Sequence, residues 1–81
     1  MTYTITIENP GLPTETHTRK RRDAAVYLFR QCVFNAIKSR AILDRPAGVR
    51  AMQRAGEVNY RDVMAVSVAV QDMTIRFRAA A

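Results

Sequence analysis

Hydrophobic and polar residues alternate in three stretches of the chain, and each stretch predicts a β-strand. Residues 2–8 place tyrosine and isoleucine on one side and threonines on the other, which is the two-residue period of a half-buried strand. Residues 63–70 and 73–78 alternate in the same way. Because β-branched residues are frequent in these stretches, strand is favoured over helix.

A fourth, polar stretch at residues 14–20 follows the first strand through a turn. Asn9, Pro10 and Gly11 place proline and glycine where a type II turn needs them. The stretch at 14–20 has no apolar side chain, so it predicts only an edge strand or an extended segment. We expect it to run antiparallel to the first strand, with the threonines of both strands on one face.

The longest periodic segment runs from Asp23 to Arg40 and predicts an α-helix. Asp23 is suited to be its N-cap, because the carboxylate can accept hydrogen bonds from the free amides of the first turn. At 100° per residue, the apolar side chains fall on one broad face. These core-facing residues are Ala25, Val26, Leu28, Phe29, Cys32, Val33, Ala36 and Ile37. Tyr27 and Phe34 lie on the opposite side, which a purely structural helix does not require.

A second, shorter helix is predicted between Asp44 and Gly56. The residue before a proline is disfavoured in the helical conformation, so the first helix ends or kinks within 42–46. Pro46 then suits the first turn of the next helix. The narrow apolar stripe of this helix consists of Val49, Met52 and Ala55. At the other end of the chain, we expect the alanines at 79–81 to fray.

The elements follow one another in the order β-β-α-α-β-β, which predicts an α+β fold. We expect one antiparallel sheet with the long helix packed across one face, in two layers, and a single domain over residues 1–81. The expected inner face of the sheet carries Tyr3, Ile5, Ile7, Met64, Val66, Val68, Ile75 and Phe77. The expected outer face carries threonines, Ala65, Ser67, Ala69, Arg76 and Arg78. We assign Met1, Met52, Met64 and Met73 to core filling.

The chain offers little material for catalysis or for a metal site. His17 is the sole histidine and Cys32 the sole cysteine, and neither has metal-ligating neighbours at the usual spacing. The acidic residues are scattered, and the three glycines do not form a phosphate-binding loop. We therefore predict a protein without enzymatic activity, metal or cofactor, in which Cys32 is a buried, unreactive thiol.

The sequence also lacks the signals of a membrane or exported protein. No stretch approaches the roughly 18 consecutive apolar residues of a membrane span. The N-terminal residues lack the basic and apolar regions of a signal peptide. We therefore expect a cytoplasmic protein without a membrane partner.

The chain is strongly basic. Its 13 lysines and arginines against 7 acidic residues give a net charge of +6, which predicts attraction to acidic protein surfaces or polyanions. The densest basic run, just before the long helix, consists of Arg19, Lys20, Arg21 and Arg22. Arg76 and Arg78 extend this surface if the last strand lies near the start of the helix. The alternative is that the run is only a solvated connection between strand and helix.

An aromatic and basic stripe follows the side of the long helix opposite its core face. It consists of Tyr27, Arg30, Phe34 and Lys38. Exposed aromatics beside arginine are enriched in protein interfaces, so an exposed stripe predicts a site for a partner or for a second copy in a homodimer. The alternative, which we favour for the two aromatics, is that the second helix or the turn at 42–45 covers them.

Two functions from different classes remain. The first is a non-enzymatic adaptor or inhibitor that docks an acidic surface of a partner protein, an economy typical of phage and mobile-element accessory proteins. The second is a basic nucleic-acid-binding module that makes salt-dependent contacts to phosphates. The expected outer face of the sheet has no aromatics for base stacking, and no recognition-helix motif is evident. We therefore favour protein binding.

Overall fold

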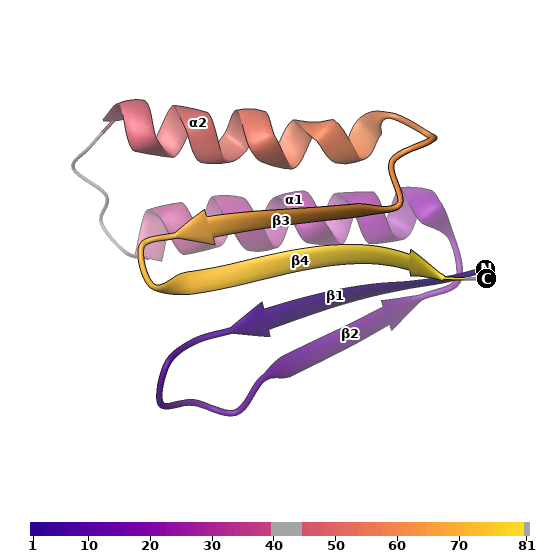
Figure 1. Ribbon diagram of the computed structural model, residues 1–81, viewed down its shortest axis with the longest axis horizontal. Helices are drawn as coiled ribbons and strands as arrows, with labels where there is room; N and C mark the ends of the chain where they lie inside the picture. Colours follow the sequence, from indigo (N-terminus) through magenta and orange to yellow (C-terminus); the bar gives the residue numbers. More distant parts are fainter. Residues whose placement is uncertain (40–44, 81) are drawn as a thin grey trace.

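The computed structural model describes residues 1–39 and 45–80 and shows a four-stranded antiparallel sheet with two helices on one face (Figure 1). The elements in chain order are β1 (Thr2–Glu8), β2 (Glu15–Arg19), α1 (Arg22–Ser39), α2 (Arg45–Gly56), a short 3-10 helix η1 (Glu57–Asn59), β3 (Ala65–Val70) and β4 (Met73–Ala80). The predicted α+β fold and the order of its elements are confirmed. The predicted end of the first helix at Arg40 lies outside the described residues.

The strands lie in the order β2-β1-β4-β3, so the first and last strands of the chain pair at the centre of the sheet. The β1–β2 turn has Gly11 at φ 77 and a hydrogen bond of 3.0 Å from the Leu12 N–H to the Asn9 carbonyl, as the proline and glycine predicted. Thr4 pairs with Thr18 and with Arg78. The threonines of β1 and β2 therefore share one face, as expected.

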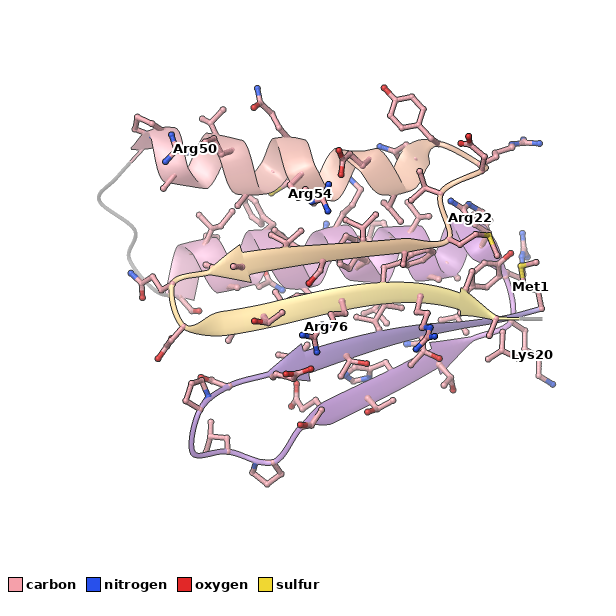
Figure 2. The ribbon with its side chains drawn as sticks, in the orientation of Figure 1. Met1, Lys20, Arg22, Arg50, Arg54 and Arg76 are labelled. Atoms are coloured by element: carbon pink, nitrogen blue, oxygen red, sulfur yellow. The ribbon has the colours of Figure 1, made fainter. Side chains whose placement is uncertain are left out.

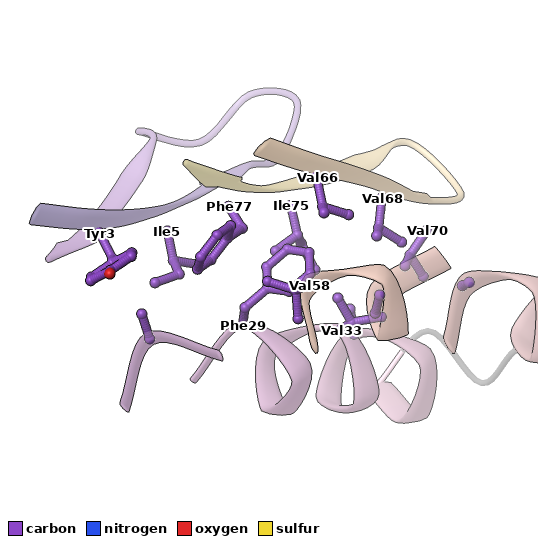
Figure 3. Packing of buried hydrophobic residues seen from close by; sticks show 14 of the residues in the cluster. Tyr3, Ile5, Phe29, Val33, Val58, Val66, Val68, Val70, Ile75 and Phe77 are labelled. Carbon is purple, nitrogen blue, oxygen red and sulfur yellow. The ribbon is translucent and has the colours of Figure 1, made fainter. Parts of the chain in front are cut away.

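The core lies between the sheet and the helices (Figure 3). Phe29 of α1 is fully buried, and its ring centroid lies 5.8 Å from that of Phe77 on β4. Tyr3 stacks on the other side of Phe77, at 6.0 Å between centroids. The buried residues of α1 are Ala25, Phe29, Val33 and Ala36, and the four other residues of its predicted core face pack against this cluster partly buried.

The start of α1 differs from the sequence prediction by one residue. The helix begins at Arg22, so Asp23 lies in the first turn and is not the N-cap. Its carboxylate accepts from the Ala24 N–H at 2.9 Å. A negative charge in the first turn still interacts favourably with the helix dipole.

The sequence predicted that the long helix covers one face of the sheet. In the structure α1 shares this face with α2, which packs beside α1 and against β3. The contact face of α2 is made of small residues: Ala51 and Ala55 are buried. A Cβ placed on Gly48 would lie 3.6 Å from Ile37 Cγ2 of α1. Of the predicted stripe, Ala55 is buried and Met52 packs against the core, but Val49 is 53% exposed and was wrongly included. The small side lets α2 approach α1 closely.

Two predictions at the strand ends are also wrong. Strand β3 begins at Ala65, and Met64 before it is 45% exposed instead of lying on the inner face. The alanines at 79–81 were expected to fray, yet Ala79 is buried and pairs with Tyr3 of β1. Ala81 lies outside the described residues. Because β1 is the central partner of β4, β4 continues to the end of that pairing.

The prediction that the four methionines fill the core is correct for two of them. Met52 and Met73 are partly buried and pack against the core. Met1 and Met64 are exposed, so their assignment to the core was wrong. Each of them comes just before the first residue of a strand, β1 or β3, where alternation no longer fixes the direction of a side chain.

Candidate partner-binding surface

The residues predicted to bind a partner lie on three separate surfaces. The first is the connection from β2 to α1, the second is the exposed side of α1, and the third is the uncovered outer face of the sheet. As the sequence allowed, β4 does lie near the start of α1, because the Arg22 guanidinium carbon is 5.5 Å from the ring centroid of Phe77. Arg76 and Arg78, however, alternate with Phe77 and project from the opposite face.

Three charges of the basic run are exposed. Arg19, Lys20 and Arg21 all lie at the surface, and Lys20 projects beyond the end of the sheet (Figure 2). Arg21 Nη2 lies 3.0 Å from Asp23 Oδ2, with both side chains largely exposed, and such surface pairs add little stability. Arg19 donates to the neighbouring Thr18 carbonyl at 2.7 Å. These three side chains are accessible to an acidic partner.

Arg22 differs from the rest of the basic run, because the fold uses its side chain. Its Nη2 donates to the backbone carbonyls of Val58, Tyr60 and Val63 at 3.0, 2.7 and 3.1 Å. The guanidinium also lies 6.0 Å from the ring centroid of Tyr3, close enough for a cation–π interaction. Arg22 therefore ties the start of α1 to the segment between η1 and β3. Its prediction as a free partner-binding charge is corrected.

The aromatic stripe on α1 is exposed. Tyr27 is 68% and Phe34 46% exposed, so α2 lies beside these rings and does not cover them. The turn at 42–45, the other cover that we expected, lies outside the described residues except for the first residue of α2. Lys38 Nζ lies 5.8 Å from the ring centroid of Phe34, and Arg30 is exposed between the two aromatics. The covered interpretation is therefore wrong for the part of the chain that the structure describes.

The stripe borders a groove of about 950 Å³. One wall is α1, with Tyr27, Arg30 and Phe34. The facing wall is formed by α2, η1 and the segment before β3. This facing wall contributes Met52, Val58, Asn59, Arg61 and Met64, and Met1 and Tyr3 also line the groove. The sequence did not identify Met1, Arg61 and Met64 as parts of this surface, because only the tertiary structure brings the start of β1 and the segment between η1 and β3 to the same hollow as α1.

The charge around this groove is positive. Arg30 and Arg61 form no ion pair among the described residues. Among the described residues of the lining, the one carboxylate, Asp23, is already paired with Arg21. The groove thus combines aromatic and methionine side chains with unpaired guanidinium groups. This combination is enriched in the binding surfaces of proteins.

The outer face of the sheet carries a second, more polar hollow of about 780 Å³. It is lined by threonines of β1 together with Arg76, Arg78 and Arg54, which reaches it from α2. Arg76 is paired with Glu8, and Arg54 with Glu57. Arg78 has no such partner among the described residues. The chemistry of this face suits anions better than apolar groups.

Cys32 of α1 lines neither of these two hollows. Burial raises the pKa of the Cys32 thiol, and Glu15 on β2 adds to this effect while Arg19 opposes it. The thiol therefore stays protonated at neutral pH and is a poor nucleophile. Residues 1–39 and 45–80 contain no group of three histidine, cysteine or acidic side chains placed to hold a metal ion.

No protein-family model matches the chain, and neither a curated protein sequence nor a solved structure matches it. Within the described ranges, neither helix has the length and apolar character needed to cross a membrane. The function is therefore inferred from the chemistry of the surfaces.

Proposed function

We propose that this chain is a small non-enzymatic binding protein, of adaptor or inhibitor type, that docks an acidic helical segment of a partner protein in the groove beside α1. One observation carries the proposal. Of the seven large apolar side chains that are exposed in the described residues, four border this groove: Met1, Tyr27, Phe34 and Met64. Exposed apolar side chains gathered in one place are typical of an interaction site.

The shape and composition of the groove favour a helix as the ligand. From Asp23 to Phe34 the wall on α1 follows about three turns, or roughly 16 Å of helix axis. Amphipathic helices bind in such grooves through apolar side chains at i, i+3, i+4 and i+7. Methionines such as Met64 adapt to apolar ligands of different shape.

Charge complementarity selects the sign of the ligand. Arg30 and Arg61 stand at the groove without carboxylate partners in the described residues, and the whole chain carries +6. Arginine binds a carboxylate in a bidentate manner. Aspartate and glutamate flanking the apolar residues of the ligand helix therefore suit this site, whereas lysine and arginine are repelled.

A selection from a random peptide library tests the proposal. The folded protein is the bait, and the peptides are about 15 residues long, which is four helical turns. We expect the recovered peptides to share helical apolar spacing and an excess of acidic residues. Binding of one such peptide, measured by fluorescence anisotropy, should weaken at least about tenfold in Tyr27→Ser/Phe34→Ser and in Arg30→Glu.

Matched substitutions on α2 serve as controls. Val49 and Arg50 are exposed and do not line the groove. Val49→Ser and Arg50→Glu should therefore leave the peptide affinity unchanged within about twofold. Equal binding by the wild type and the Tyr27→Ser/Phe34→Ser variant would refute the docking site, as would recovered peptides without acidic enrichment.

Nucleic-acid binding is the second candidate, and the outer face of the sheet favours it. Arg54, Arg76 and Arg78 line one hollow there together with threonine hydroxyls, which is suitable for phosphate oxygens. Glu8 and Glu57 offset part of this charge. Such binding would rest on phosphate contacts and would be steeply salt-dependent.

A salt series separates the two functions. Retention of a mixed-sequence duplex or single strand at about 0.2 M salt, lost in Arg78→Glu, would favour nucleic acid over an exclusively protein partner. We expect retention to disappear by that salt concentration. The acidic peptide should remain bound, because its apolar contacts in the groove are little affected by salt.

A further inference from the structure

The sheet has two edges, and they differ in what packs beside them: α2 packs against β3 at one edge. At the β3 edge, Arg54 of α2 donates through Nε to the Ser67 carbonyl at 3.3 Å. At the other edge, β2 pairs with β1 alone, and Figure 1 shows no helix or strand of the described residues beyond it. An unpaired edge presents backbone donors and acceptors to any strand that fits it.

The pairing of the sheet identifies which backbone groups of β2 face outward. In an antiparallel pair, residues alternate between those bonded to a given neighbour and those turned away from it. The Ala79 N–H donates to the Met64 carbonyl at 2.8 Å, so odd-numbered residues of β4 bond to β3. The even-numbered residues of β4 therefore bond to the even-numbered residues of β1. Thr16 and Thr18 of β2 lie opposite these even-numbered residues of β1, so their own backbone groups point to the free edge. The Arg19 side chain that reaches the Thr18 carbonyl agrees with this direction.

The sequence of this edge is self-complementary in charge. The strand reads Glu15, Thr16, His17, Thr18, Arg19. When it is paired antiparallel with itself about His17, Glu15 of each copy lies opposite Arg19 of the other. The two threonines lie opposite each other, and nowhere do like charges meet. Shifting this pairing by two residues in either direction separates glutamate from Arg19.

The side chains of these charged pairs lie on the same face and at close range. Glu15 pairs with Ile7 and Arg19 with Tyr3, so both charges are on the helix side of the sheet. In the pairing about His17, the Thr16–Thr18 positions exchange backbone hydrogen bonds. Glu15 and Arg19 then form the non-hydrogen-bonded positions, where Cα atoms are only about 4.5 Å apart and side chains are closest.

We propose that β2 pairs with β2 of a second copy about a two-fold axis at His17, joining two four-stranded sheets into one. Charges on an edge strand usually keep other strands away. Here the order of the charges is unfavourable for pairing with most strands but favourable for pairing with a second copy of β2. A two-fold axis requires a surface that complements itself, and the edge meets this condition. The interface is smaller than a standard one, so we expect dimers at high micromolar concentration.

Charge reversal with rescue tests this pairing by sedimentation equilibrium at concentrations up to about 500 µM, a range suited to a weak interface. Glu15→Arg and Arg19→Glu each place like charges opposite each other, so each should raise the dimer dissociation constant about tenfold or more. The combined Glu15→Arg/Arg19→Glu variant restores opposite charges and should dimerise like the wild type. Arg50→Glu makes the same charge change on α2 and should have no effect.

A cross-link provides a second measurement that does not depend on those variants. His17→Cys, in a Cys32→Ala background, places two thiols at the two-fold axis. A Cα separation of about 4.5 Å lies within the range that disulfides span. We expect this variant to oxidise to a covalent dimer, whereas Leu12→Cys in the exposed β1–β2 turn should remain mainly monomeric.

Several results would overturn the dimer. A folded wild-type protein that remains monomeric at about 500 µM, a concentration at which a weak interface of this size associates, would do so. Single charge reversals without effect, or a double variant as weak as the singles, would also refute it. Should a single variant fail to fold, the wild-type measurement and the cross-link decide. The groove variant Tyr27→Ser/Phe34→Ser should dimerise normally, which keeps this proposal separate from peptide docking.

Discussion

Replacing Arg22 with alanine is expected to destabilise the protein far more than replacing its neighbour Arg21. The Arg22 side chain is half-buried, and its Nη2 serves three carbonyls between Val58 and Val63 at 2.7–3.1 Å. This nitrogen has two hydrogens, so the three contacts amount to about two full hydrogen bonds. Arg21, by contrast, has an 80% exposed side chain and one surface ion pair.

The size of the effect follows from these contacts. A hydrogen bond from a charged donor contributes about 1.5–3 kcal/mol, less where water can replace the donor. A partly exposed cation–π contact to Tyr3 or Phe77 adds about 0.5–1 kcal/mol. Because these contributions share one side chain and are not additive, we expect Arg22→Ala to cost about 2–4 kcal/mol. In a domain of this size, that lowers the melting temperature by roughly 10–25 °C.

Thermal unfolding followed by circular dichroism measures this effect. Arg21→Ala should lower the melting temperature by less than about 3 °C, as expected of an exposed pair. Arg22→Lys keeps the charge but not the planar guanidinium, so it should recover only part of the loss. If Arg22→Ala and Arg21→Ala shift the midpoint equally, Arg22 is not the link between α1 and the segment before β3. It would then return to the candidate binding charges.

Three further predictions concern other parts of the chain. Tyr27→Ser/Phe34→Ser should cost less than about 1.5 kcal/mol in the free energy of unfolding, because Tyr27 is largely exposed and Phe34 about half exposed; a larger loss in chemical denaturation would place them in the core. Ala79→Asp should lower the free energy of unfolding by about 2–3 kcal/mol, since it buries a carboxylate opposite Tyr3. The same change at the exposed Ala80 should be nearly neutral, and equal effects at the two positions would indicate that the end of β4 is frayed. Because burial raises the pKa of Cys32, its thiol should react with a disulfide reagent at pH 8 more slowly than free cysteine, with the rate rising as pH increases; a rate at or above that of free cysteine would contradict this.

The four charges of the basic run lie in two different environments. Arg22 belongs to folding, while Arg19, Lys20 and Arg21 remain at the surface. Sequence composition treats the four charges alike. Their separation arises because the first turn of α1 directs Arg22 towards carbonyls that arrive from about 40 residues further along the chain.

The sequence by itself determined the elements and most of the core. Alternation of β-branched and polar residues is a local property, so the strands and the inward direction of Ile5, Val66 and Phe77 could be predicted. The helical period identified the buried side of α1 around Phe29 in the same way. The proline–glycine turn also fixed the antiparallel return of β2, because it depends on only four residues.

Tertiary structure decided everything that depends on which elements become neighbours. Alternation assigned Met64 to the core, but β3 begins after it, so its side chain turns to the groove instead. The small side of α2 places that helix beside α1 rather than over Tyr27, which leaves the stripe exposed. Pairing of β1 with β4 extends the last strand through Ala79. Each outcome depends on contacts between distant segments, and no local period of the sequence encodes them.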